Sequence, residues 1–239
     1  MIKTEDLPYN DGPTACNGFL AFDDTLAGKR PGVLVVHEAF GLGEHAMERA
    51  RMLAKEGYVA LAADLFGGRR QIAPADLMDV IGGLMADPPK LRGRAKAALS
   101  ALAARPEVDA AKLFGIGFCF GGTTVLELAR DGVGLLGVVG FHSGLQTGAP
   151  AQPGKVKASV LALIGADDGL IPAEQRLAFE AEMRKAGADW QLTAYGNTRH
   201  SFTNPDADGT VMPDIVYDAK ADQRSWRAML DFFAERLKA

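Results

Sequence analysis

The chain has 239 residues, of which 48% are hydrophobic and 23% are charged, an ordinary composition for a globular protein. A chain of this length buries enough apolar surface to fold without disulfides or metals, and its two cysteines, Cys16 and Cys119, lie far apart. The formal net charge of −4, with no basic stripe along any helix, argues against a nucleic-acid partner.

The first residues, Met1 to Pro13, contain acids and a proline where a signal peptide needs an apolar core. The longest apolar runs are as long as a strand and far shorter than a membrane span. We therefore expect one domain over residues 1–239, located in the cytoplasm and not at a membrane. We expect it to be a monomer or a small homo-oligomer.

Strand and helix patterns alternate along the chain. Thr14–Phe22 alternates weakly as a strand does, and Gly32–Val36 is a continuous run typical of a strand buried on both faces. Glu44–Lys55 is expected to be a helix that Gly57 ends. The remaining expected elements are strand Tyr58–Ala62, helix Lys90–Ala104, strand Lys112–Ile116, helix Gly121–Arg130, strands Leu135–Phe141 and Ser159–Ile164, helix Pro172–Ala186, strand Trp190–Tyr195 and helix Ala219–Leu237, capped by Asp218.

This alternation predicts an α/β fold with a mostly parallel central sheet and helices on both faces. In such sheets, functional groups gather at the carboxyl ends of the strands. The loops that follow the predicted strands are therefore the places to look for a site.

One such loop contains a candidate nucleophile. Strand Lys112–Ile116 runs into Gly117-Phe118-Cys119-Phe120-Gly121-Gly122 and then a helix. This spacing is typical of a nucleophile elbow, with cysteine in place of serine. The glycines relieve the clash that so tight a turn causes. The helix N-terminus favours a thiolate and an oxyanion beside it.

Two other interpretations of the elbow stay open. Its glycines also resemble a dinucleotide-binding turn, but that turn needs an acid at the end of the next strand, which instead ends at Phe141-His142. Cys119 can also be a structural cysteine, because free cysteines are often buried.

A nucleophile needs a base, and the base needs a group that orients it. Asp167-Asp168 follows strand Ser159–Ile164, and His200 follows strand Trp190–Tyr195, so both lie at the same edge as Cys119. The order of nucleophile, acid and histidine is the order of α/β-hydrolases. A lone loop histidine is more often solvated than catalytic, but the ordered set of three is more specific than any one member.

The sequence resembles the dienelactone hydrolase family over nearly its whole length. The motifs that carry the resemblance are Val35–Gly41, Ala63–Gly67, the cysteine elbow, the Gly-x-x-Asp-x-x-Ile-Pro segment and His200-Ser201-Phe202. The resemblance implies an α/β-hydrolase that cleaves enol lactones or related small esters, of the carboxymethylenebutenolidase type, without a cofactor or metal. It assigns the nucleophile to Cys119, the base to His200 and the acid to Asp168, which stands four residues before Pro172.

The same resemblance assigns roles to three further residues. Without it, Glu38 would be interpreted as a solvated loop carboxylate. In the family, the equivalent glutamate lies beside the cysteine and takes its proton when substrate arrives. That role requires partial burial, which would raise the pKa of Glu38. The backbone N–H groups of Ala39 and Phe120 would form the oxyanion hole.

The sequence departs from the family at the two arginines that bind the substrate carboxylate. One expected position is Asn204, which stays a candidate for substrate binding, and the other lies in the region around Asp76, which has no arginine. Arg69 and Arg70 are near enough to substitute, although exposed arginines are usually just solvated.

Small esters or lactones are the expected substrates. Two alternatives stay open: a thioesterase or acyl-transferring hydrolase with the same three residues, and a non-catalytic relative that binds a small molecule. The complete set of Cys119, Asp168 and His200 weighs against the second.

Overall fold

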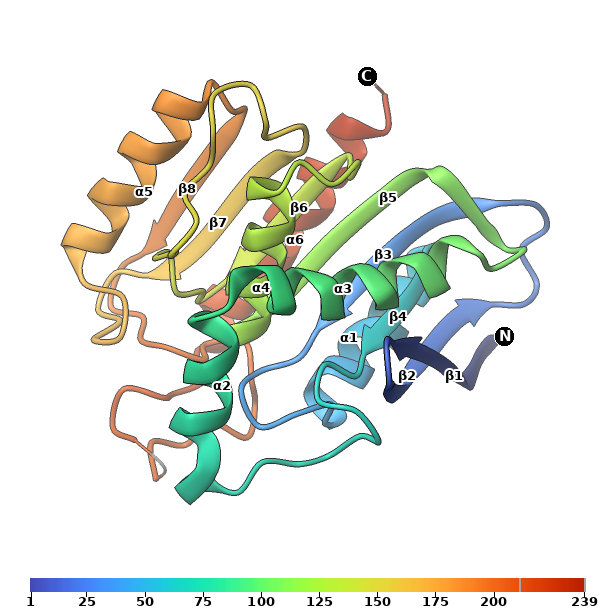
Figure 1. The fold of residues 1–239 in the computed structure, drawn as a ribbon, viewed down its shortest axis with the longest axis horizontal. Coiled ribbons are helices and arrows are strands. Elements are labelled where there is room, and N and C mark those ends of the chain that lie inside the picture. The colour runs from blue at the N-terminus through green and yellow to red at the C-terminus, as the bar shows by residue number, and fades with distance from the viewer. Residues whose placement is uncertain (211, 239) are drawn as a thin grey trace.

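The computed structural model describes residues 1–210 and 212–238, and it contains one eight-stranded sheet in the order β1-β2-β4-β3-β5-β6-β7-β8 (Figure 1). Strands β3 to β8 run parallel to one another, and β1 and β2 form an antiparallel hairpin at one edge. The strands are β1 (Ile2–Asp11), β2 (Thr14–Asp23), β3 (Arg30–Val36), β4 (Val59–Ala63), β5 (Val108–Phe118), β6 (Gly137–Phe141), β7 (Ser159–Gly165) and β8 (Trp190–Tyr195).

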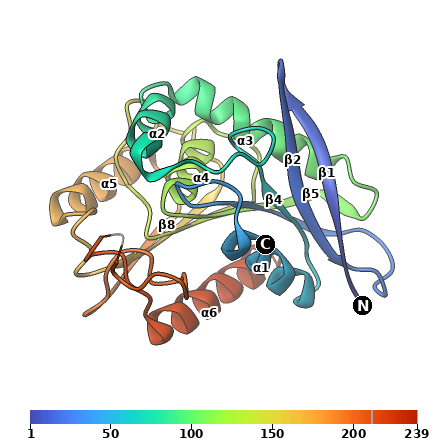
Figure 2. The same cartoon turned by 90° about the horizontal axis from the view of Figure 1, so that it is seen from below.

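Helices cover both faces of the sheet, with α1 and α6 on one face and α2 to α5 on the other (Figure 2). They are α1 (Glu44–Lys55), the short 3₁₀ helix η1 (Pro74–Asp76), α2 (Leu77–Met85), α3 (Pro88–Ala103), α4 (Phe120–Arg130), α5 (Ala173–Ala186) and α6 (Ala219–Arg236). Each face has its own apolar cluster. The predicted α/β architecture is therefore confirmed. None of the helices in the described residues is long and apolar enough to cross a bilayer.

Besides the short η1, two longer elements, β1 and α2, lie outside the predicted set. β1 is an edge strand that pairs only with β2, so its side chains are largely polar and it tolerates Pro8. α2 is short and mostly exposed, and it carries Gly82 and Gly83, which disfavour a helix. In both cases the sequence lacks the apolar pattern of a buried element, by which the other strands and helices were predicted.

The six parallel strands bring six loops to one edge of the sheet, because their carboxyl ends all point the same way. These loops begin at His37, Asp64, Cys119, His142, Ala166 and Gly196, after β3, β4, β5, β6, β7 and β8. Every side chain predicted to take part in catalysis lies in one of them. The sheet therefore determines which distant parts of the chain can form one site.

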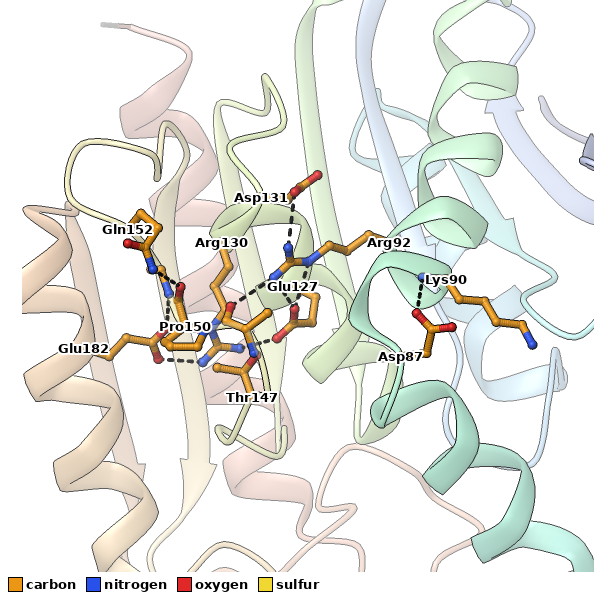
Figure 3. A network of polar contacts seen from close by, with 12 residues as sticks. Asp87, Lys90, Arg92, Glu127, Arg130, Asp131, Thr147, Pro150, Gln152 and Glu182 are labelled. Carbon is orange, nitrogen blue, oxygen red and sulfur yellow. Dashed lines mark hydrogen bonds and ion pairs between the residues drawn. The ribbon is translucent and has the colours of Figure 1, made fainter.

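A buried ion-pair network joins three helices on one face of the sheet (Figure 3). Glu127 on α4 pairs with Arg92 on α3 at 2.7 Å and with Arg130 at 3.1 Å. Arg130 also pairs with Glu182 on α5 at 2.9 Å and donates to the Leu145 carbonyl at 2.7 Å. The side chains of Glu127 and Arg130 are only 3% and 1% exposed. The network therefore ties α3, α4 and α5 to the loop after β6.

We expect Glu127→Gln to lower the free energy of unfolding by about 3 kcal/mol, because a broken buried pair leaves charge uncompensated. This is the lower end of the usual range, since Arg92 and Arg130 keep Asp131 and Glu182 as partners. Urea unfolding measures the loss.

The matched control is Glu180→Gln, which removes an exposed pair with Arg184 on α5. It should change the free energy of unfolding by at most about 1 kcal/mol. Equal losses in the two variants would show that the buried network stabilises no more than a surface pair does.

Candidate active site

Cys119 occupies a tight turn between β5 and α4, with φ of 54° and ψ of −117°. A residue other than glycine rarely adopts this left-handed backbone conformation. A Cβ on Gly117 would lie 2.1 Å from the Gly121 carbonyl oxygen, and a Cβ on Gly121 would lie 2.2 Å from the Val36 carbonyl oxygen. Glycine is therefore required at both positions, and the predicted geometry of the turn is confirmed. The turn leaves Cys119 half-buried at the sheet edge.

The backbone amides around this turn differ in what they can bind. The Cys119 N–H is shared between the Phe141 carbonyl oxygen at 3.0 Å and Nδ1 of His142 at 3.1 Å. The amides of Phe120 and Ala39 donate to no group in the described part of the chain. Phe120 is also the first residue of α4, where the helix dipole is positive. These amides are thus free to donate, and their oxyanion role stays a prediction.

Asp168 and His200 form a buried pair across the sheet edge. Nδ1 of His200 lies 2.8 Å from Oδ2 of Asp168, and the two side chains are 3% and 0% exposed. The second oxygen, Oδ1, accepts the Leu170 amide at 2.9 Å. Asp167 is exposed, and its own amide donates to the Thr198 carbonyl oxygen. Asp168, and not Asp167, is therefore the residue that holds the histidine.

The protonation of His200 is governed by its surroundings. Burial alone would lower the pKa of His200, but the negative charge of Cys119 and the hydrogen bond to Asp168 raise it to about 10. Nε2, the ring nitrogen opposite Asp168, is buried and makes no hydrogen bond with the described residues. This nitrogen is available to the Cys119 thiol or to a substrate.

Glu38 follows β3, and its side chain is 17% exposed. Oε2 of Glu38 accepts from the side-chain amide of Asn204 at 2.7 Å, and Oε1 accepts from the Ser201 hydroxyl at 3.3 Å. Nδ1 of His45 lies 3.4 Å from Oε2. Burial alone would raise the pKa of Glu38, but His45, Asn204 and the charge of His200 outweigh it and lower the pKa. The prediction of a raised pKa is therefore wrong. The roles of Glu38 as a base and of Asn204 in substrate binding stay predictions.

The two arginines predicted to substitute for the family's pair have different surroundings. The guanidinium of Arg69 donates to the carbonyl oxygens of Asn17 and Gly18, both at 2.8 Å, and pairs with Asp6. Its guanidinium thus contacts the β1–β2 hairpin, and its role in substrate binding stays a prediction. Arg70 is exposed, as solvated loop arginines usually are. Its role in substrate binding stays a prediction.

Three polar side chains next to the site are absent from the predicted set. Nε2 of His142 lies 2.8 Å from Oγ1 of Thr203, and that oxygen lies 3.4 Å from Nε2 of His45. The ring of His142 also packs edge-on against His200, with 5.0 Å between centroids. Only His142 leaves a signal in the sequence, because it directly follows a buried strand at the functional edge. No spacing reveals that a helix residue and a loop residue meet it.

A cavity of about 270 Å³ lies along α4, beginning one turn beyond the elbow. Its wall is formed by Met85, Pro88, Leu91, Thr123, Glu127, Gln146, Thr147 and Gly148. Neither Cys119 nor His200 lines it, so the cavity adjoins the candidate site and does not contain it. Within residues 1–210 and 212–238, no group of three or more histidine, cysteine, aspartate or glutamate side chains could hold a metal ion.

The Asp168 geometry predicts unequal effects of two neighbouring substitutions. Asp168→Asn should lower kcat by up to about ten-thousand-fold, because an amide no longer fixes the required tautomer of His200. Asp167→Asn should leave kcat near the wild-type value, since Asp167 is exposed. The measurement is the steady-state rate on a p-nitrophenyl ester. A loss in Asp167→Asn as large as in Asp168→Asn would contradict this assignment.

Comparisons with known proteins identify the family of this chain. The Dienelactone hydrolase family matches residues 17–237. The chain is 30% identical over 244 residues to a Salmonella typhimurium protein named "Putative carboxymethylenebutenolidase", covering 97% of this chain and 83% of that one. The crystal structure of a dienelactone hydrolase-like promiscuous phosphotriesterase from metagenomic libraries is 45% identical, with a TM-score of 0.92 and 98% of each chain covered.

A more distant structure, the dienelactone hydrolase from Anabaena variabilis, is 20% identical with a TM-score of 0.67, covering 95% of this chain and 97% of that one. At this identity the likeness concerns the fold alone. The family match spans nearly all of the sheet and the loops at its functional edge. The chain belongs to the dienelactone hydrolase family, with the α/β-hydrolase fold.

Proposed function

We propose that this carboxylic ester hydrolase cleaves small, uncharged esters or lactones through an acyl-enzyme on Cys119. His200 acts as the base, and Asp168 orients it. The observation that carries the proposal is the environment of His200, which is bonded to Asp168 on one side and subject to the charge of Cys119 on the other. A structural cysteine would have no need of such a partner.

In the proposed reaction the proton of the Cys119 thiol resides on Nε2 of His200, because the raised pKa of His200 favours the imidazolium. The sulfur attacks the ester carbonyl, and the amides of Phe120 and Ala39 stabilise the resulting oxyanion. The imidazolium of His200 then protonates the leaving alcohol, which leaves a thioester on Cys119. Water, deprotonated by His200, attacks this thioester and releases the acid. Asp168 remains ionised throughout and keeps the imidazole oriented.

Charge around the site supports an uncharged substrate. The side-chain amide of Asn204 donates to Glu38, and the guanidinium of Arg69 donates to the hairpin backbone. The similar metagenomic enzyme is named for phosphotriesters, which carry no charge on phosphorus oxygens. Burying a substrate carboxylate without a cationic partner would cost free energy of binding.

The nucleophile is tested by comparing the two cysteines. Cys119→Ala should lower ester hydrolysis by several powers of ten. Cys16→Ala is the matched control and should retain activity, because Cys16 is buried and burial raises the pKa of its thiol. Steady-state rates on p-nitrophenyl acetate and mapping of iodoacetamide adducts measure both effects. Wild-type activity in Cys119→Ala would refute the mechanism.

Substrate charge is tested with two esters of similar acyl length, p-nitrophenyl butyrate and mono-p-nitrophenyl glutarate. We expect kcat/KM to be at least about tenfold higher for the butyrate, a difference of about 1.4 kcal/mol. Hydroxide-catalysed rates of the two esters correct for their intrinsic reactivity. A preference for the glutarate would show that a cation, with Arg70 the first candidate, binds the substrate carboxylate.

A further inference from the structure

Buried polar groups form a continuous chain of contacts between the nucleophile turn and Glu38. The Cys119 amide lies 3.1 Å from Nδ1 of His142, and Nε2 of that ring lies 2.8 Å from the Thr203 hydroxyl. The hydroxyl lies 3.4 Å from Nε2 of His45, whose Nδ1 lies 3.4 Å from the Glu38 carboxylate. His142 and Thr203 are fully buried, and the His45 side chain is 9% exposed.

The donors along this chain can all point in one direction. A backbone N–H only donates, so Nδ1 of His142 accepts from Cys119, and the neutral ring carries its proton on Nε2. That proton is donated to Thr203, whose own hydroxyl proton is then free for Nε2 of His45. Nδ1 of His45 is buried and makes no hydrogen bond with the described residues, and the Glu38 carboxylate lies 3.4 Å away as an acceptor for its proton. The donors of His142, Thr203 and His45 then all point toward Glu38.

Arg49 supports this tautomer of His45. Its Nε lies 3.3 Å from Nε2 of His45, and an arginine nitrogen can only donate. A second guanidinium nitrogen of Arg49 donates to the Thr203 carbonyl oxygen and to Asp222. Nε2 of His45 also lies 3.1 Å from the Thr203 carbonyl oxygen, but that oxygen already accepts from Arg49 and is satisfied without a proton from His45. Nε2 of His45 is left as an acceptor.

The two ends of this chain adjoin the two amides expected to bind the oxyanion. Cys119 is bonded directly to Phe120, and Glu38 is bonded directly to Ala39. We propose that His142, Thr203 and His45 are positioning residues that hold these two peptide groups in register for the oxyanion. This inference rests on the proposed ester hydrolysis. It assigns the three residues to transition-state stabilisation, although none of them touches the substrate.

The physical reason is the narrow geometric tolerance of an oxyanion hole. Its donors must lie within hydrogen-bond reach of an oxygen that carries charge only in the transition state. Phe120 begins α4, whereas Ala39 follows β3, so no single element of secondary structure holds both amides. The contacts through His142, Thr203 and His45 connect the two elements across this gap. Its loss should weaken binding of the transition state while leaving binding of the ester nearly unchanged.

Thr203→Val breaks the chain at its middle without altering either end. We expect kcat per active site to fall by about ten- to a hundredfold, less than the effect of deleting an oxyanion donor outright. KM should change little, and affinity for a trifluoromethyl ketone, whose thiol adduct mimics the tetrahedral intermediate, should fall in parallel with kcat. The burst of nitrophenol counts active sites. Thr203→Ser should restore most of the rate, because it restores the hydroxyl.

Thr198→Val is the matched control. Thr198 is a buried threonine just before His200, and its hydroxyl donates to the Gly196 carbonyl, outside the chain of contacts. It should lower the melting temperature without changing kcat per active site. If Thr203→Val behaves in the same way, the three residues are merely structural and the inference is overturned.

Histidine tautomers provide a test that does not require turnover. In ¹⁵N spectra of the wild type, neutral His142 should carry its proton on Nε2 and His45 on Nδ1. A proton on Nδ1 of His142 would overturn the inference whatever the activity, because that nitrogen could not then accept from Cys119. A protein with the expected tautomers but no esterase activity would instead contradict the proposed function.

Discussion

The close approach of α4 to the ends of β3 and β5 is the constraint on which the site depends. Strand and helix backbones meet where Gly117 and Gly121 leave no room for a Cβ, and the chain must then turn through a left-handed residue. That residue is Cys119. The turn directs its amide to the His142 side chain and leaves the next amide, at the start of the helix, without a partner among the described residues. The nucleophile and an anion-binding group thus result from one backbone feature.

The second feature on which the site depends is the balance of charge at the carboxyl ends of the parallel strands. The carboxylates of Asp168 and Glu38 lie there, each next to donors that compensate its burial. Asp168 accepts from His200 and from a backbone amide, which orients the base. Glu38 takes its donors from α1 and from the loop after β8, so it joins elements that are distant in the sequence. Its lowered pKa favours a role as a permanent anion over one as a proton acceptor at neutral pH.

Much of this arrangement could be predicted from sequence. The apolar runs identify the parallel strands, and the position of Asp168 relative to Pro172 separates it from Asp167. The predicted cap of α6 is also confirmed, since Asp218 accepts two amides of its first turn. Strand β1 could not be predicted, because an edge strand has few apolar residues in its sequence. Contacts between distant segments, such as those that lower the pKa of Glu38, leave no pattern along the chain.

The central claim is that an acyl group passes through the sulfur of Cys119. The most direct test is to mix the protein with p-nitrophenyl pivalate, whose crowded acyl group slows hydrolysis, and to quench the reaction with acid. Intact-mass measurement should show one added pivaloyl group, and peptide mapping should locate it on Cys119. Release of a stoichiometric burst of nitrophenol without an adduct, or with an adduct on another residue, would contradict the account.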